Sequence, residues 1–333
     1  MMPTPRFAIG ALVALAAVSA LSACSASNPS GGEGGSDGIT IAAVFPNTSD
    51  PYWQTMSCGA ASKADELGID LQQFNSTNTD ANTVASNFQS ASLIGADGMI
   101  VNPPLNNNQF AAQYQKLMSD GIPVVTSNGT DPQVEYQNIF SDTETAGFVD
   151  DVASLIPEGS GSMVYLGGAP GIPPLESRTL PFVEAVQASR PDLTVLPTDY
   201  SGFDINKATT SVSSMIIANP DLKLIIAADG PDGVGAAAAI EQAGKAGEIA
   251  LIAFDAVPPE VEALRSGTIS ALIAQNPFAI GEGFVTAIND YLTENPDGGA
   301  VSAAGSQEIP NAVLTADNID DPENADYLYR ASC

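Results

Sequence analysis

The sequence predicts an α/β protein whose parallel sheets are covered by helices on both faces. From Ile39 onward, short apolar runs rich in β-branched residues alternate with longer helical segments. These runs are apolar almost throughout, rather than at every second position, which is typical of strands buried on both faces. The number of strand–helix units exceeds what one sheet comfortably holds. We therefore expect two Rossmann-like lobes.

Each predicted element follows from this pattern. The strands, recognised as short apolar and β-branched runs, are expected at residues 39–45, 70–74, 98–102, 123–126, 162–166, 193–198, 222–228, 249–254 and 269–274. The helices between them are expected at residues 52–67, 80–94, 110–120, 143–155, 177–190, 205–218, 232–243, 260–266 and 280–293. Asp80 and Asp204 are suited to cap helix N-termini. Glycine follows several of the helices, at Gly68, Gly95, Gly121, Gly244 and Gly267.

Breaks in the pattern indicate where the chain passes between the lobes. They fall at residues 128–132, near Asn276-Pro277, and at residues 305–310. If all are crossings, the first lobe comprises 39–130 plus 277–307, and the second comprises 131–276 plus 308–333. Short segments joining two lobes form a hinge, and the carboxyl ends of the strands would face the cleft between them.

The N-terminus has the features of a secretory signal peptide. Arg6 precedes an apolar run at 7–20, which is too short for a permanent membrane helix. The run ends in Leu21-Ser22-Ala23-Cys24, which resembles a bacterial lipobox, so residues 1–23 are expected to be removed and Cys24 lipidated. An ordinary signal peptide that ends near a cysteine is the alternative. Residues 24–38 are rich in glycine and serine and are expected to form a flexible tether.

The charge and the residue types restrict the possible functions. The chain has 39 acidic and 10 basic residues, a formal net charge of −29. Nucleic acid is therefore not an expected partner, because phosphate binding needs a basic surface. Histidine is absent, which removes Ser-His-Asp and Cys-His catalysis and the commonest zinc ligand. Carboxylate-pair glycosidases need no histidine, so an extracellular hydrolase stays a weaker alternative.

The cysteines suggest one disulfide. If Cys24 carries lipid, Cys58 and Cys333 remain in an oxidising compartment. A bond between them would join the chain end to an early helix. The alternative is two unpaired thiols, one buried and one at a frayed terminus.

Several segments, in order, resemble the type I periplasmic sugar-binding proteins, of which the ribose-binding protein is the type case. The first is IAAVFPNTSDPYWQTMSCGAASKADELG at 41–68; the others lie at 97–103, 121–125, 203–204, 227–229, 253–255 and 273–277. Together they span essentially all of the chain after the tether. The resemblance implies two lobes, a hinge of three segments, a ligand enclosed by closure, and delivery to a membrane permease of the ABC class. It implies no enzyme activity, cofactor or metal, and a monomer is expected.

The resemblance also implies a set of ligand-binding residues. They are the side chains that match, or replace, the family's polar and aromatic pocket positions: Asp50, Tyr52, Trp53, Asn102, Asn128, Glu176, Phe203, Asp229, Asp255 and Gln275. Aromatic rings suit the apolar face of a sugar, and carboxylates accept hydrogen bonds from its hydroxyls. Other roles stay open. Tyr52 and Trp53 could pack in the core, Asp50 and Asp229 could be helix caps, and Asn102 could belong to a turn.

Departures from the family pattern suggest an unusual charge in the pocket. Gly129 and Glu176 stand where many members carry arginine, and Arg178 falls at a position expected to be structural and to point away from Glu176. The cleft would then hold Asp50, Glu176, Asp229 and Asp255 without a fixed cation. Two such charges about 5 Å apart repel by roughly 3 kcal/mol at an effective dielectric near 20. A protonated carboxyl, a bound cation or a cationic ligand would have to offset this.

We therefore expect an extracytoplasmic solute-binding lipoprotein for a neutral sugar or sugar alcohol. A cationic or amino polyol is the second candidate ligand, and a sensor that presents its ligand to a receptor is the second candidate role. The DNA-binding repressors that share this fold are excluded, because a signal peptide and a tether occupy the place of their helix-turn-helix.

Overall fold

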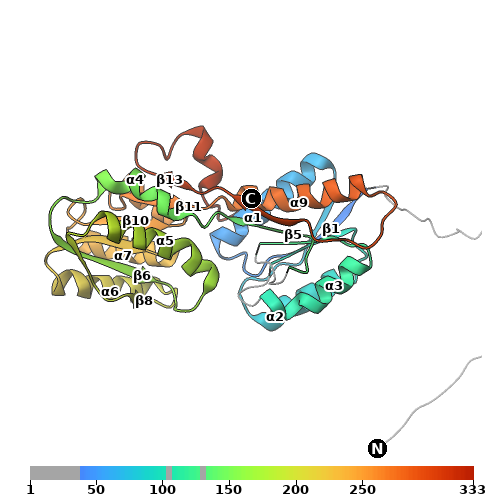
Figure 1. Ribbon diagram of the computed structural model, residues 1–333, viewed down its shortest axis with the longest axis horizontal. Coiled ribbons are helices and arrows are strands. Elements are labelled where there is room, and N and C mark those ends of the chain that lie inside the picture. Colours follow the sequence, from blue (N-terminus) through green and yellow to red (C-terminus); the bar gives the residue numbers. More distant parts are fainter. Residues whose placement is uncertain (1–37, 103–106, 128–132) are drawn as a thin grey trace, which may run out of the picture. The chain divides into compact units, whose positions relative to one another are not determined.

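The computed structural model describes residues 38–102, 107–127 and 133–333 (Figure 1). Gly38–Cys333 is one compact unit that contains both sheets and every hydrophobic cluster. The fold class predicted from the sequence, an α/β protein with two parallel-sheet lobes, is confirmed. The signal peptide, Cys24, the tether up to Asp37, and Asn128 lie outside the described residues.

The first lobe is built on a six-stranded sheet in the order β12-β5-β4-β3-β1-β2, in which every pairing is parallel. In chain order its strands are β1 Thr40–Val44, β2 Asp70–Gln73, β3 Gly98–Val101, β4 Val124–Thr126, β5 Gln137–Ser141 and β12 Gly305–Ile309. One face packs against α1 (Pro51–Leu67) and α9 (Pro277–Glu294), and the other against α2 (Ala81–Ala91) and α3 (Ala111–Ser119).

The close contact between α1 and α9 depends on two glycines. A Cβ atom at Gly59 would lie 2.0 Å from the carbonyl oxygen of Phe278, and one at Gly281 would lie 2.0 Å from that of Met56. Neither position can hold a larger residue unless the helices separate. The two helices therefore form a tightly packed pair, although they lie more than 200 residues apart in the sequence.

The second lobe is built on a sheet in the order β13-β11-β10-β9-β6-β7, with the short β8 (Asp199–Tyr200) paired to β6. Its other strands are β6 Gly161–Gly167, β7 Leu193–Val195, β9 Leu222–Ala227, β10 Ala250–Phe254, β11 Ala271–Ala274 and β13 Ala312–Leu314. Only β13 pairs antiparallel among the described strands. One face carries α6 (Ile205–Ala218), α7 (Gly230–Gln242) and α8 (Pro258–Arg265), and the other α5 (Pro173–Ser189) and α4 (Val149–Val152).

At two of the three crossings, the boundary between the lobes differs from the one expected from the sequence. The strand β5 pairs with β4 and β12, so the first lobe extends at least to Ser141 rather than ending at residue 130. The strand β12 stays in the first sheet to Ile309, two residues beyond the expected boundary at 307. The sequence signal was misleading because β5 is short and mostly polar, so no continuous apolar run marks it as a strand of the first sheet.

Other differences concern short or polar elements. The helix predicted at 143–155 is three short turns: the 3₁₀ turns η2 (Thr145–Phe148) and η3 (Ala153–Leu155), with α4 between them. Four short strands, β5, β8, β12 and β13, were not predicted. Three of them, β5, β12 and β8, are mostly polar or half-exposed, so no buried pattern marks them.

The predicted helix boundaries are confirmed where capping chemistry marked them. Asp80 and Asp204 accept hydrogen bonds from backbone N–H groups in the first turns of α2 and α6. Gly68 ends α1 at a φ of 69°, a left-handed conformation that favours glycine. Within the part of the chain that the structure describes, no helix has both the length and the apolar character needed to cross a membrane.

Candidate functional site

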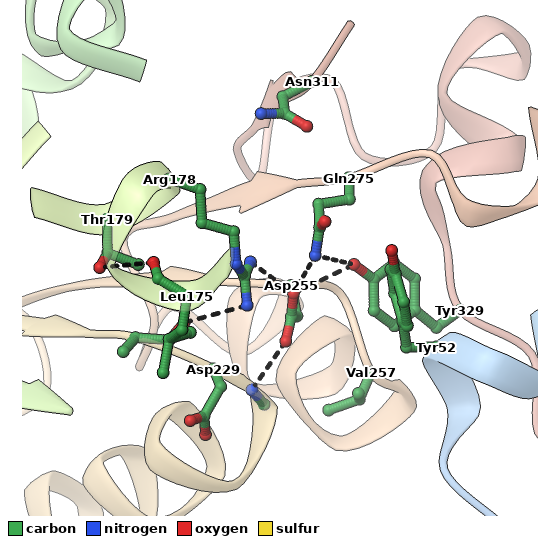
Figure 2. Close-up of polar contacts among 12 residues, drawn as sticks. Tyr52, Leu175, Arg178, Thr179, Asp229, Asp255, Val257, Gln275, Asn311 and Tyr329 are labelled. Carbon is green, nitrogen blue, oxygen red and sulfur yellow. Dashed lines mark hydrogen bonds and ion pairs between the residues drawn. The ribbon is translucent and has the colours of Figure 1, made fainter. Parts of the chain in front are cut away.

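Asp255 is the centre of a buried polar network at the carboxyl end of the second sheet (Figure 2). It directly follows β10, and its backbone has a φ of 83°. Its Oδ1 accepts hydrogen bonds from Arg178 Nη1 at 2.8 Å, Gln275 Nε2 at 2.9 Å and Tyr329 Oη at 3.1 Å. Its Oδ2 accepts from Gly230 N at 3.2 Å. The network therefore joins α5, α7, β11 and the C-terminal segment at one carboxylate.

Arg178 corrects the expected charge of the site. The sequence placed Glu176 toward the cleft and left the site without a fixed cation, but the buried Arg178 guanidinium forms an ion pair with Asp255 at 2.8 Å. A second hydrogen bond, from Nη2 to the carbonyl oxygen of Ala228 at 3.3 Å, fixes its plane. Burial is the largest influence and opposes the charge, but Asp255 and two neighbouring tyrosines together outweigh it and raise the pKa of Arg178. The site thus contains a permanent positive charge.

Glu176 lies apart from this network. Its Oε1 accepts a hydrogen bond from Gly171 N at 2.7 Å, and its side chain borders an exposed hollow on α5 together with Leu180 and Glu184. The two side chains do point to different sides of α5, as expected, but it is Arg178 that joins the buried network. Helix neighbours are three or four residues apart, so the sequence predicted that the two side chains point to different sides. It did not indicate which of the two sides faces the edge of the sheet.

A second group of acids surrounds the start of α7. Asp229 follows β9 and caps α7, accepting from Asp232 N at 3.0 Å, while its buried Oδ2 has no partner in the part of the chain that the structure describes. Asp232 is fully buried, and Ser201 and Asp229 lie near it without making a hydrogen bond of normal geometry to its side-chain oxygens. Burial, then the neighbouring Asp232, raises the pKa of Asp229 to about 8; burial raises the pKa of Asp232 to about 6.

Glu260 is the deepest of these acids and was not predicted. It is fully buried in the first turn of α8, where its Oε2 accepts from Val257 N at 3.1 Å and its Oε1 has no hydrogen-bond partner among the described residues. Burial raises its pKa well above the usual value. Asp229 and Glu260 are therefore groups that hold protons at pH values where exposed carboxyls are ionised.

Tyr329, in the C-terminal segment, was also missed by the sequence reasoning. Besides its bond to Asp255, its hydroxyl lies 3.5 Å from Gln275 Nε2, and its ring centroid is 5.8 Å from that of Tyr52. It is almost fully buried. A lone tyrosine near the end of a chain carries no local signal, because its partners are 54 and 74 residues away in sequence.

On the first lobe, Asp50 and the aromatic pair lie at the end of β1. Asp50 caps α1, its Oδ1 accepting from Tyr52 N at 2.9 Å, and burial raises its pKa to about 6. Tyr52 and Trp53 pack edge to face with centroids 5.1 Å apart. Trp53 packs on the first lobe's core, whereas Tyr52 contacts the cores of both lobes. The capping role of Asp50 is thus confirmed, and Tyr52 is the aromatic that meets the second lobe.

Asn102 follows β3 and is completely buried. Its Oδ1 accepts from the N–H of Ser127 at 2.9 Å and from the Ser127 hydroxyl at 2.8 Å, which ties β3 to the end of β4. Its Nδ2 has no hydrogen-bond partner among the described residues and remains a free donor. Since an orphan buried donor is costly, this amide is suited to a ligand oxygen.

Phe203 and Asp255 are the non-glycine residues with positive φ in the described chain, at 61° and 83°. Phe203 is about half-exposed, at 45%. Its ring lies over Gly168: a Cβ there would come within 2.2 Å of the ring and 2.4 Å of Asp229 Oδ2. The structure therefore brings Phe203 and Asp229 together across a glycine that leaves room for both. Such strained backbone commonly marks functional sites.

Cys58 and Cys333 form a disulfide, with Cα atoms 5.3 Å apart. It links α1 to the chain end across a sequence separation of 275 residues. Among the described residues, no group of three or more cysteine, aspartate and glutamate side chains has the arrangement that holds a metal ion.

Comparisons with known proteins agree with the α/β fold and identify the family. The family described as "Periplasmic binding protein domain" matches residues 41–307. The ribose import binding protein RbsB of Salmonella typhimurium is 28% identical over 246 residues, covering 73% of this chain and 81% of that protein. The xylitol-binding protein of Mycolicibacterium smegmatis is 26% identical over 258 residues, covering 74% of this chain and 69% of that protein.

A similar solved structure is an ABC transporter solute-binding protein from Agrobacterium vitis bound to α-D-tagatopyranose. It has a TM-score of 0.73 and 26% identity, and covers 88% of this chain and 99% of that one. A sugar ABC transporter sugar-binding protein from Bacillus halodurans, with a TM-score of 0.74 and 19% identity, shares the fold and covers 85% of this chain and 99% of its own.

Proposed function

Because the chain belongs to the periplasmic binding protein domain family, we propose that it is the substrate-binding component of an ABC importer, and that it binds a neutral sugar or sugar alcohol between its lobes. The observation that carries the proposal is the meeting of polar and aromatic side chains at the carboxyl ends of both sheets. This is where open α/β sheets bind ligands. Binding by hinge closure, rather than turnover, is the proposed activity.

The charge balance of the site favours a neutral ligand. Arg178 compensates Asp255, and the raised pKa of Asp229, about 8, allows this group to carry a proton at neutral pH, whereas Asp50, with a pKa of about 6, does so at slightly acidic pH. The repulsion expected from the sequence is therefore offset within the protein, and no cationic ligand is needed to offset it. Protonated and ionised carboxyls together provide both donors and acceptors for hydroxyl groups.

The unpaired groups are suited to the same chemistry. Among the described residues, Asn102 Nδ2 on the first lobe and Asp229 Oδ2 on the second have no hydrogen-bond partner. Trp53 and Phe203 supply apolar ring faces. We propose Asp50, Tyr52, Trp53, Asn102, Asn128, Phe203, Asp229, Asp255 and Gln275 as ligand-binding residues, with Glu176 at the entrance.

Localisation and anchoring form part of the proposal. The signal peptide at 1–23, lipidation of Cys24 and a tether would hold the protein at the outer face of the membrane, as a monomer, beside its permease. Globomycin treatment of producing cells, which blocks lipoprotein signal cleavage, would cause a larger precursor to accumulate. Unchanged processing would contradict lipidation.

The ligand proposal is tested by thermal shift on Gly38–Cys333, against neutral pentoses, hexoses, polyols, amino sugars, sugar acids and Ca²⁺. A ligand that binds only the folded protein raises the midpoint as ln(1 + [L]/Kd) increases. We expect a large shift with a neutral sugar or polyol. A shift with amino sugars alone would favour the cationic alternative, and hydrolysis of a bound glycoside would favour the hydrolase.

A further inference from the structure

The C-terminal segment Tyr329–Cys333, here called the strap, begins in the second lobe. It follows β13, which pairs with β11, and the 3₁₀ turn η4 (Pro322–Tyr327). Tyr329 belongs to the second lobe's core, and its backbone N–H donates to the carbonyl oxygen of Ala256 at 3.0 Å. Its hydroxyl donates to Asp255 at 3.1 Å (Figure 2). The start of the strap is therefore fixed to the second lobe at two points.

The strap ends on the first lobe. Arg330 N donates to Thr55 Oγ1 of α1 at 2.6 Å, and the Arg330 guanidinium lies 4.1 Å from the ring centroid of Phe278 in α9. Cys333 is joined covalently to Cys58 of α1. Consecutive backbone N–H groups, those of Tyr329 and Arg330, are thus bound to opposite lobes. The tight packing of α1 against α9 makes this a firm anchor.

We propose that the strap is a fourth connection between the lobes, closed by the disulfide, which limits their separation and holds Tyr329 at the ligand site. The polypeptide otherwise passes between the sheets after β5, between β11 and α9, and between β12 and β13. From Tyr329 to Cys333 an extended chain spans at most about 14 Å. The lobes can move apart only within that reach while Tyr329 remains bound.

The strap has a consequence for affinity, and this part rests on the proposed function. If a ligand binds only the closed form, its apparent Kd depends on the fraction of free protein that is closed, and the Kd increases as this fraction falls. A strap that excludes widely open forms raises that fraction in the free protein. It also keeps Tyr329 packed near Tyr52 and bonded to Asp255 before ligand arrives, which lowers the ordering cost of binding.

The test compares wild-type Gly38–Cys333 with the variant Cys58→Ala/Cys333→Ala by small-angle X-ray scattering without ligand. We expect a larger radius of gyration for the variant, and nearly equal radii once saturating ligand is added. The Kd for the best ligand from the thermal-shift screen should rise about three- to tenfold. Thr55→Val, which removes the hydrogen bond from Arg330 N and keeps the disulfide and the Arg330–Phe278 contact, should change both quantities in the same direction by less.

A matched control separates the strap from general stability. Ile288→Val trims a buried side chain of the first lobe's core, away from the strap, and should lower the unfolding midpoint without changing the radius or the Kd. A lower midpoint with an unchanged ligand-free radius in the double cysteine variant would overturn the proposal. The bond would then act only by restricting the unfolded chain.

The two proposals fail separately. The scattering comparison needs no ligand, so a larger ligand-free radius supports the strap even if no sugar or polyol binds. Absence of any binding to wild type would refute the proposed function alone. An increased radius with an unchanged Kd would overturn the affinity consequence.

Discussion

The carboxyl-end edges of the two sheets, which meet at the site, differ in the number of charged groups they carry and in how these charges are compensated. On the first lobe the edge carries a single candidate carboxyl, Asp50, beside two aromatic rings and the amide of Asn102. On the second lobe it carries Asp229 and Asp255, with Asp232 and Glu260 buried behind them and Arg178 as the compensating cation.

The difference shows that similar sheets can present different chemistry at the same edge. In the first lobe, Asp50 is bonded locally as a helix cap, and Asn102 is bonded to Ser127 through its oxygen while its Nδ2 has no partner among the described residues. In the second lobe, the buried polar groups are stabilised by one long-range ion pair and by protons that buried acids hold. We therefore expect the second lobe's edge to be the more sensitive to substitution and to pH.

The largest effect is expected from Arg178→Met. It leaves Asp255 buried without its cation, so the free energy of unfolding should fall by about 3–5 kcal/mol, measured by urea denaturation. Lys63→Met, which breaks the exposed Lys63–Glu66 pair of the first lobe, is the control and should have no measurable effect. Adding Asp255→Asn to Arg178→Met should restore part of the loss. A loss below about 1 kcal/mol would mean that the ion pair does not stabilise the network.

Substitution of the aromatic residues at the two edges should affect stability and ligand affinity differently. Phe203→Gly relieves a positive φ and removes a half-exposed ring, so the stability should stay within about 1 kcal/mol of wild type while the affinity for the sugar ligand falls about tenfold. Trp53→Ala should lower both quantities, because Trp53 also packs in the first lobe's core. Calorimetric titration with chemical denaturation measures both. Unchanged affinity of Phe203→Gly would remove Phe203 from the ligand site.

The two capping aspartates offer a narrower comparison. Asp50→Ala should cost about 1 kcal/mol of stability through loss of the α1 cap, and Asp50→Ser should recover most of it. Asp229→Ala should cost less, since loss of the α7 cap is accompanied by relief of the cost of burying this carboxyl and of placing it beside Asp232. Thermal unfolding at pH 7 measures both. Equal losses would show that the two acids do not repel each other in the folded protein.

The last prediction concerns the dependence of stability on pH. Asp50, Asp229 and Asp232 have folded-state pKa values above their ordinary value, about 6, 8 and 6. The folded protein therefore binds more protons than the unfolded chain between about pH 4 and 8, and these groups make stability fall as pH rises through that window. Unfolding midpoints at pH 5 and pH 8 should show this fall, and Asp232→Asn should reduce it. An equal fall in the variant would assign the dependence to other groups.

The resemblance to a known family singled out Asp229, Asp255 and Gln275 as candidate site residues. The structure has each of them within two residues of the end of a strand of the second sheet, and Asp255 and Gln275 are hydrogen-bonded to each other. The capping alternative for Asp50 was also available from sequence, and the structure adopts it. What failed was the direction of side chains on α5, where Arg178 rather than Glu176 enters the network. That choice depends on which face of the helix packs on the sheet.

By itself the sequence determined the alternation of strands and helices, and with it the two parallel-sheet lobes, because burial on both faces leaves continuous apolar runs. It also marked helix ends, since capping needs particular residues at particular places. Only the tertiary structure decided the sheet membership of the polar strands β5 and β12, the pairing of Arg178 with Asp255, and the placement of Tyr329 at the site. These depend on contacts between residues far apart in the chain, whose energies come from burial and mutual compensation of charge that no local pattern records.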